Sequence, residues 1–341
     1  SAYAADWNFY GSARVSTFWE DVDAGSGPDP DTNFEEALQS NARIGAKVKV
    51  SDELTGRFEY GASDGKANIR LLYGEWDFGA GKLLVGQDYT PMYLPGPNQV
   101  YDNDLGLDGV GNVNGNLRKA QIKLTFGGFQ LAFVENNKNY VGYDAEEDED
   151  VKTSDDVDTI IPLIMAKYAL TYENWVFALA GGYQTFDVDN GTVDDDVTSW
   201  GLALDIAATF GAFRVTGQVN GGTNVGNLYA IDVSDLVYGS GYAAVDDKVY
   251  DNDAMGFRLS LGYTFNEMFG VEVGYGYQQT EFDVSGSEED EVQSYYIQFP
   301  ITLAPGVHIV PEVGVIDYED DYAGNGEDEI TYFGAKWQIN F

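Results

Sequence analysis

Basic side chains occur at alternate positions of apolar segments in the first third of the chain. In residues 43–49, for example, Arg43 and Lys47 alternate with Ile44 and Val48. Successive side chains of a β-strand point to opposite faces, so the basic residues share one face and the apolar residues the other. The same parity along the chain places six basic residues on the polar face: Arg14, Arg43, Lys47, Arg57, Lys119 and Lys123.

Acidic residues that could oppose these cations lie in residues 89–116, a stretch rich in glycine and proline. They are Asp102, Asp104 and Asp108. Opposed rows of charge across a narrow aqueous gap create a strong field, which favours small polar solutes over apolar ones. The alternative is a polar face that is merely wet, with scattered charges. We favour the constriction because basic residues concentrate in the early segments. The face taken by Arg70 stays open, because the alternation around it breaks.

Acidic residues also form runs at 146–150, 194–196, 288–291 and 317–329. Such runs are typical of a solvated, mutually repelling surface, and we favour this interpretation. Calcium binding is the alternative, because Ca²⁺ takes six to eight oxygen ligands. The candidate ligands are Asp102, Asp104, Asp108, Asp187 and Asp189. No other cofactor is expected.

The composition excludes several classes of function. The chain has no cysteine and a single histidine, His308, which removes thiolate chemistry and most histidine-rich metal sites. By parity His308 lies on the polar face, away from lipid, so no enzymatic activity is expected. The formal charge of −39 would repel the phosphates of nucleic acid.

Sixteen alternating segments must position these residues. They span residues 6–20, 41–50, 54–63, 68–78, 82–88, 117–126, 129–135, 160–172, 175–185, 198–210, 213–220, 254–265, 269–278, 292–303, 307–316 and 329–341. Short turns alternate with longer loops, and aromatic residues flank the short turns. No apolar run approaches the roughly 18–20 residues of a membrane helix, whereas a barrel strand needs only about 9–11.

This pattern predicts an all-β fold, a 16-stranded antiparallel transmembrane β-barrel with short periplasmic turns and long extracellular loops. We expect one domain over residues 1–341. The last segment, 329–341, alternates apolar and polar residues up to Phe341 and should pair with residues 6–20 to close the barrel. A large soluble β-sandwich or solenoid is the alternative.

Several motifs resemble the general diffusion porins of Gram-negative bacteria. The motifs are Phe9-Tyr10-Gly11, Ala42-Arg43-Ile44-Gly45-Ala46-Lys47, Ser51-Asp52-Glu53-Leu54-Thr55-Gly56, Tyr73-Gly74, Asp77-Phe78-Gly79, Val85-Gly86-Gln87 and the last strand. The resemblance implies a homotrimer and an inward fold of residues 89–116 that narrows the pore. It also implies that Phe341 is recognised by the outer-membrane assembly machinery. Gln87 departs from the family, which often has arginine there.

The implied function is a water-filled channel of the outer membrane, in contact with lipid and lipopolysaccharide, for passive diffusion of small hydrophilic solutes and ions. The acidic rim predicts a preference for cations, because a negative vestibule concentrates them. A substrate-selective channel is the first alternative, and a non-conducting structural or adhesin barrel is the second.

Overall fold

The computed structural model describes most of the chain. The described residues are 5–25, 32–63, 66–94, 96–101, 104, 107–113, 118–144, 149–153, 157–159, 161–189, 193–229, 242–243 and 248–341. Within these residues, no helix has the length and apolar character that a membrane span requires.

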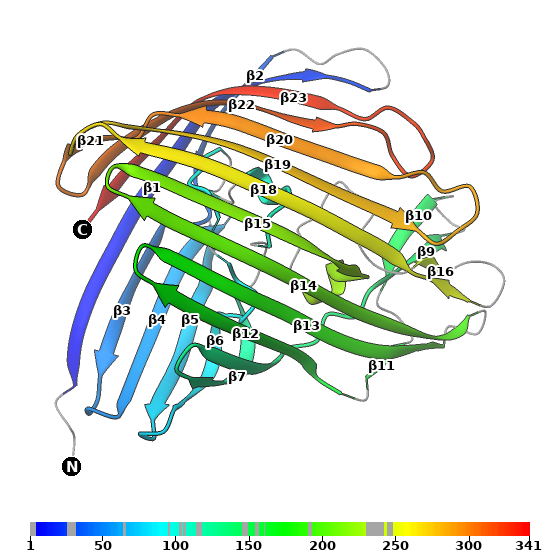
Figure 1. Cartoon of the computed structure of the whole chain (residues 1–341), viewed down its shortest axis with the longest axis horizontal. Helices are drawn as coiled ribbons and strands as arrows, with labels where there is room; N and C mark the ends of the chain where they lie inside the picture. Colours follow the sequence, from blue (N-terminus) through cyan, green and yellow to red (C-terminus); the bar gives the residue numbers. More distant parts are fainter. Residues whose placement is uncertain are drawn as a thin grey trace.

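Sixteen antiparallel strands form one closed barrel, which confirms the predicted fold (Figure 1). Each wall strand pairs with its neighbours in the sequence, and the first pairs with the last. The wall strands are β1 (Asp6–Asp23), β3 (Arg43–Lys49), β4 (Leu54–Ser63), β5 (Lys66–Asp77), β6 (Lys82–Tyr89), β7 (Arg118–Phe126), β8 (Phe129–Val134), β12 (Leu163–Tyr172), β13 (Trp175–Asp189), β14 (Asp194–Phe210), β15 (Phe213–Thr223), β18 (Asn252–Thr264), β19 (Gly270–Phe282), β20 (Asp290–Gln298) with β21 (Ile301–Ala304), β22 (Val307–Tyr318) and β23 (Glu329–Asn340).

Smaller elements extend or accompany the wall. β2 (Asn33–Leu38) pairs with the second half of β1, and β11 (Val157–Asp158) continues the line of β12 against β13. The predicted strand 292–303 is divided into β20 and β21 at Pro300, which has no backbone N–H to donate. A separate small sheet contains β9 (Tyr140–Asp144), β10 (Glu149–Thr153), β16 (Tyr242–Ala243) and β17 (Val249–Tyr250). The described residues also form two short 3₁₀ helices, η1 (Leu107–Gly109) and η2 (Val225–Leu228).

β1 and β23 close the barrel, as the alternation of the last segment predicts. Their antiparallel register runs from Ser12 opposite Asn340 to Asp23 opposite Glu329. The backbone N–H of Gly11 donates to the carbonyl oxygen of Phe341 at 2.7 Å, and the N–H of Phe341 donates back at 3.0 Å. All strand edges at this seam are therefore paired.

The outer surface of the barrel is apolar. Phe9 is 67% exposed and Leu202 is 54% exposed, as expected for side chains that contact lipid. Aromatic residues beside the short turns, such as Tyr172 and Phe265, are also exposed. These positions form the aromatic girdle that favours a membrane–water interface.

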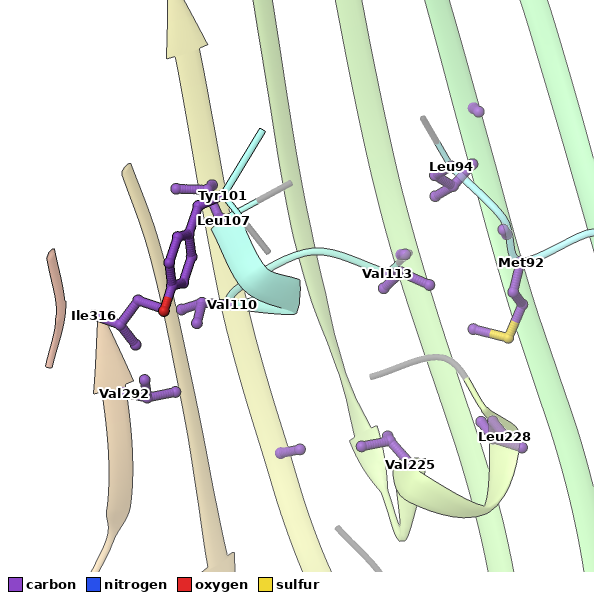
Figure 2. Close-up of a cluster of buried hydrophobic side chains, with 14 of the residues drawn as sticks. Met92, Leu94, Tyr101, Leu107, Val110, Val113, Val225, Leu228, Val292 and Ile316 are labelled. Atoms are coloured by element: carbon purple, nitrogen blue, oxygen red, sulfur yellow. The ribbon is translucent and has the colours of Figure 1, made fainter. Parts of the chain in front are cut away.

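Buried apolar side chains lie inside the barrel, between its wall and two inward segments (Figure 2). We call the described residues between 90 and 113 the inner loop; the second segment is η2. The side chains that meet there are Met92, Leu94, Tyr101, Leu107, Val110, Val113, Val225, Leu228, Val292 and Ile316. The interior of the barrel is therefore partly filled by packed protein.

Candidate functional site

Side chains of the wall hold the backbone of the inner loop. The N–H groups of Val100 and Tyr101 donate to the Glu312 carboxylate on β22, at 2.8 and 3.0 Å. The N–H of Asn98 donates to Glu272 on β19 at 2.7 Å, and that of Val113 donates to Gln218 on β15 at 2.6 Å. A buried backbone N–H group without a partner costs about 1–3 kcal/mol, so these contacts fix the path of the loop along this side of the barrel.

A buried ion pair between β14 and β18, which lie on either side of β15, holds the last described part of the inner loop. The guanidinium of Arg258 on β18 is fully buried and lies 2.5 Å from the Asp205 carboxylate on β14. Its Nε donates to the side-chain oxygen of Asn112 at 2.7 Å, and its Nη1 donates to Thr216 at 3.0 Å. Arg258 therefore joins two wall strands to the loop.

Gly276 on β19 provides the close approach between wall and loop, because a Cβ there would overlap the carbonyl oxygen of Val110. The substitution Gly276→Ala should displace the loop and lower the free energy of unfolding by about 1–3 kcal/mol, the usual cost of overpacking. Heat denaturation and protease accessibility of residues 96–113 would measure this. Gly262→Ala on β18 is the matched control, because its Cβ would have no neighbour nearer than 3.5 Å. Equal losses in the two variants would contradict the prediction.

η2 is a second inward segment, and the sequence reasoning did not find it. Its Leu228 lies against Gly182 on β13 and Gly201 on β14, where a Cβ would approach the leucine side chain within 3.4 and 3.1 Å. The Asn227 side chain donates to the backbone of Asn139 at 3.0 Å. The available signal was the run of glycine and alanine at inward positions of β13 and β14, which leaves space for other side chains.

β1, β3 and β4 carry the arginines that sequence parity placed on the polar face, Arg14, Arg43 and Arg57. At their centre, Glu59 is 1% exposed. Its carboxylate lies 2.8 Å from Arg70, 3.2 Å from Arg57 and 3.6 Å from Arg43. The Tyr10 hydroxyl donates to it at 2.9 Å. We call Arg43, Arg57, Arg70 and Glu59 the arginine cluster.

A β-bulge turns Arg70 into the barrel. Glu59 pairs with Leu71 and Tyr60 pairs with Ile69, so Arg70 is an extra residue in β5. An extra residue in one strand reverses the side-chain alternation beyond it. Ile69 is 45% exposed on the outside, whereas Arg70 is 4% exposed and bound to Glu59. The bulge answers the question that the sequence left open.

Arg14 and Asp104 are in direct contact. The Arg14 guanidinium on β1 lies 2.6 Å from the Asp104 carboxylate, and Lys336 on β23 lies 3.0 Å from the same oxygen. Asn41 donates to it at 2.9 Å. Asp104 therefore joins the inner loop to both strands of the closing seam. Asp102 lies outside the described residues, and Asp108 is described only as backbone within η1.

Three other predicted cations form no ion pair with Glu59 of the arginine cluster. Lys123 binds Asp88 at 2.7 Å, and the Lys119 ammonium lies 3.8 Å from the centre of the Tyr229 ring. Lys47 lies nearer the 50–53 turn. Burial raises the pKa of Tyr229 to about 12, so its hydroxyl stays neutral beside Lys119.

Arg118 is a pore-wall cation that strand parity missed. Parity with Ala120 predicts an outward side chain, but Arg118 lies over the ring of Tyr89 at 5.8 Å. Tyr89 in turn contacts Tyr93 of the inner loop, with ring centres 4.1 Å apart. Arg118 also interacts electrostatically with Glu59 and with two arginines of the cluster. The signal that could have found it is the end of regular pairing at the first residue of β7.

The described residues contain no group of three or more acidic or histidine side chains placed to hold a metal ion. Asp187 lies opposite Asp196 in the β13–β14 register, and Asp189 lies opposite Asp194. Asp158 on β11 lies opposite Asp187 on its other side, so like charges face one another across these strands. Calcium binding at the candidate aspartates stays a prediction.

Comparison with known proteins assigns the chain to a family. A family model described as Gram-negative porin matches residues 1–321. The chain is a Gram-negative porin. The predicted family and the predicted outer-membrane location are confirmed. A porin is a channel and not an enzyme. No curated protein matches this porin in sequence.

Solved outer-membrane proteins share the fold of this porin. The outer membrane channel DcaP of Acinetobacter baumannii superposes with a TM-score of 0.76 at 17% identity, covering 100% of the porin and 99% of that chain. OmpT of Vibrio cholerae, in its trimer form, has a TM-score of 0.62 at 16% identity, with 98% and 99% covered. An anion-selective porin from Comamonas acidovorans has a TM-score of 0.66 at 12% identity, with 99% and 100% covered. Identities this low show the fold alone.

Proposed function

We propose that this porin forms a water-filled channel for passive diffusion of small hydrophilic solutes and ions along the wall of β1 and β3 to β7. The observation that carries this proposal is the division of the inner wall. The inner loop and η2 cover much of the side from β13 to β23, whereas the arginine cluster stays partly exposed. Residues 89–116 would then act as the constriction loop, with Arg14, Arg43, Lys47, Arg57, Lys119 and Lys123 along the path.

Two zones of opposite charge would lie in series along this path. Glu288 and Glu319 lie in the loops after β19 and β22, and Glu291 lies at the start of β20; the three belong to the acidic rim. Burial and the neighbouring carboxylates raise the pKa of Glu319, as expected in a strongly negative region. The arginine cluster, in contrast, has three guanidiniums around one carboxylate. The rim would attract cations, and the cluster would attract anions.

The ion selectivity should therefore depend on salt concentration. At 0.01 M salt the screening length is about 30 Å, so the rim should act across the vestibule and favour cations; at 1 M it is about 3 Å, so the nearby arginines should favour anions. Reversal potentials in planar bilayers, under equal concentration ratios at low and high salt, would measure the change of sign. The same sign at both concentrations would contradict the two-zone proposal. If the protein inserts into the bilayer but no current flows, the channel proposal itself is wrong.

A substrate-selective channel is the second candidate, and the arginine cluster is the observation that favours it. Arginine presents a planar fork of donors that matches a carboxylate in two-point contacts. Arg43 and Arg57 keep 22% and 27% of their side chains exposed, so they remain accessible to a solute. If the flux of a carboxylate solute saturates as its concentration rises, while the flux of an uncharged solute of equal size rises linearly, this candidate is supported.

Self-association into a homotrimer is part of the proposal. The trimer form of the structurally similar Vibrio cholerae protein supports it. Ala13, a small residue exposed on the outer face of β1, would suit close packing of subunits, whereas Gly11 is covered by the ring of Phe341. Lipid and lipopolysaccharide around the barrel, and recognition of Phe341 by the assembly machinery, also remain proposals. Chemical crosslinking in detergent would test the trimer, and bands no larger than a monomer would contradict it.

A further inference from the structure

The strands β1, β3, β4 and β5 lie side by side in the wall (Figure 1). A row of inward-facing polar side chains crosses these four strands on the short-turn side of Glu59. Asn8 on β1 pairs with Lys47 on β3, Lys47 pairs with Arg57 on β4, and Arg57 pairs with Tyr73 on β5. Directly paired residues share one face of the sheet, with Cβ atoms about 4.5–5.5 Å apart. We call these four residues the lower row.

The lower row places two cations directly opposite each other. Like charges at paired positions destabilise a sheet, so this arrangement needs a compensating partner. Arg57 obtains one by turning toward the cluster, where its Nη2 lies 3.2 Å from Glu59 and its Nε donates to Tyr10 at 2.8 Å. Among the described residues, Lys47 has no carboxylate within ion-pair distance, and its side chain is exposed to the lumen. In the part of the chain that the structure describes, Lys47 thus has no direct ion-pair partner.

Two acidic side chains, Asp6 and Glu75, lie in the same region. Glu75, at the edge of the same region, binds Lys82 at 2.8 Å. Asp6 pairs with Lys49 in the next row toward the turn, and Lys49 binds Asp52 at 2.7 Å. The recess between these side chains has a volume of about 450 Å³. Its charged lining has three cations, Lys47, Lys49 and Arg57, against the two carboxylates of Asp6 and Glu75, and Asn8 and Tyr73 complete the polar lining. This volume is sufficient for a small solute with its hydration water.

We propose that the lower row is a binding site for the anionic group, carboxylate or phosphate, of a solute at the turn-side end of the channel. Lys47 supplies a mobile ammonium, Arg57 a guanidinium, and Asn8 and Tyr73 neutral donors; together these suit an oxyanion. Arg57 belongs both to the lower row and to the arginine cluster. An anion that leaves the cluster therefore meets Lys47 next. This inference rests on the proposed channel function and adds a second anion-binding site along the channel.

The test compares the wild type with Lys47→Gln, Lys47→Arg and Lys66→Gln in planar bilayers. Chloride current is recorded while phosphate, or in a second series acetate, is added to each chamber in turn. The Lys66→Gln control removes the same charge from an exposed position at the other end of β5. The half-blocking concentration should rise roughly tenfold in Lys47→Gln, the scale of one charge-assisted hydrogen bond. Lys47→Arg should retain wild-type block.

The control defines what would overturn the inference. In Lys66→Gln the half-blocking concentration should change by less than about twofold, because an exposed charge far from the site contributes little. Unchanged block in Lys47→Gln, or an equal change in Lys66→Gln, would overturn the site and leave the channel proposal intact. Absence of wild-type conductance would instead overturn the channel proposal. An effect in only the phosphate or only the acetate series would support the site and identify its ligand class.

Discussion

The substitution Glu59→Gln should lower the free energy of unfolding by about 3 kcal/mol, because breaking a buried ion pair leaves an uncompensated charge. Glu59 is the carboxylate at the centre of the arginine cluster, and Arg70 beside it is only 4% exposed. Arg57 and Arg43 keep contact with water, so most of the loss should come from Arg70. The shift of the heat-unfolding transition of the folded barrel would measure the loss.

The same substitution should also change ion selectivity. Removal of one negative charge leaves three guanidiniums facing the channel, so the reversal potential at high salt should move toward anions. Glu75→Gln is the matched control: it also removes one carboxylate from the inner wall, but its pair with Lys82 is partly exposed and contributes about 0–1 kcal/mol. Equal losses of stability in the two variants would contradict the prediction, because they would show that the buried contacts of the arginine cluster add no stability beyond those of an exposed pair.

The substitution Arg258→Met should give a second large loss, about 3–5 kcal/mol, because it leaves the Asp205 carboxylate buried without its cation. It also removes the donor to Asn112 at 2.7 Å, so the last described part of the inner loop should loosen. Single-channel recordings should then show larger or noisier conductance. Arg214→Met is the control, since Arg214 is 36% exposed and lies 3.5 Å from Glu272.

A double variant separates the two effects of Arg258. Arg258→Met with Asp205→Leu replaces the buried ion pair by apolar side chains, which is often neutral for stability. It should regain most of the lost stability, yet it still lacks the contact to Asn112. The altered conductance should therefore persist. Recovery of both properties together would show that Arg258 stabilises the wall and does not position the loop.

Much of the barrel could be predicted because each wall strand separates lipid from water. Such a strand must alternate apolar and polar residues, and the short turns with their flanking aromatic residues mark where it ends. The predicted closure of residues 6–20 against 329–341 follows from the same parity, and the structure confirms it. Deviations occur where a local feature breaks the period, as at Pro300 and at the bulge of Arg70.

The site could be predicted only in part. Parity placed Arg14, Arg43 and Arg57 on the inner face, but it could not show which charges meet. Arg70 follows a bulge and Arg118 lies at the edge of regular pairing, so both required the three-dimensional structure. The apolar lining under the inner loop and η2 was also hidden, because an inward glycine such as Gly182 gives no hydrophobic signal. Its function is to leave space for a side chain from another segment.

The docking of the inner loop at the seam of β1 and β23 has a consequence for the order of folding. The Tyr101 ring stacks on Tyr332 of β23 at 3.8 Å and meets Phe18 of β1 edge-on at 5.3 Å, while Asp104 binds both Arg14 and Lys336. Neither strand alone offers this surface, since it forms only when the earliest and latest parts of the wall have met. The docking site of the inner loop, the proposed constriction, is therefore completed by the same event that closes the barrel, and an open barrel lacks it.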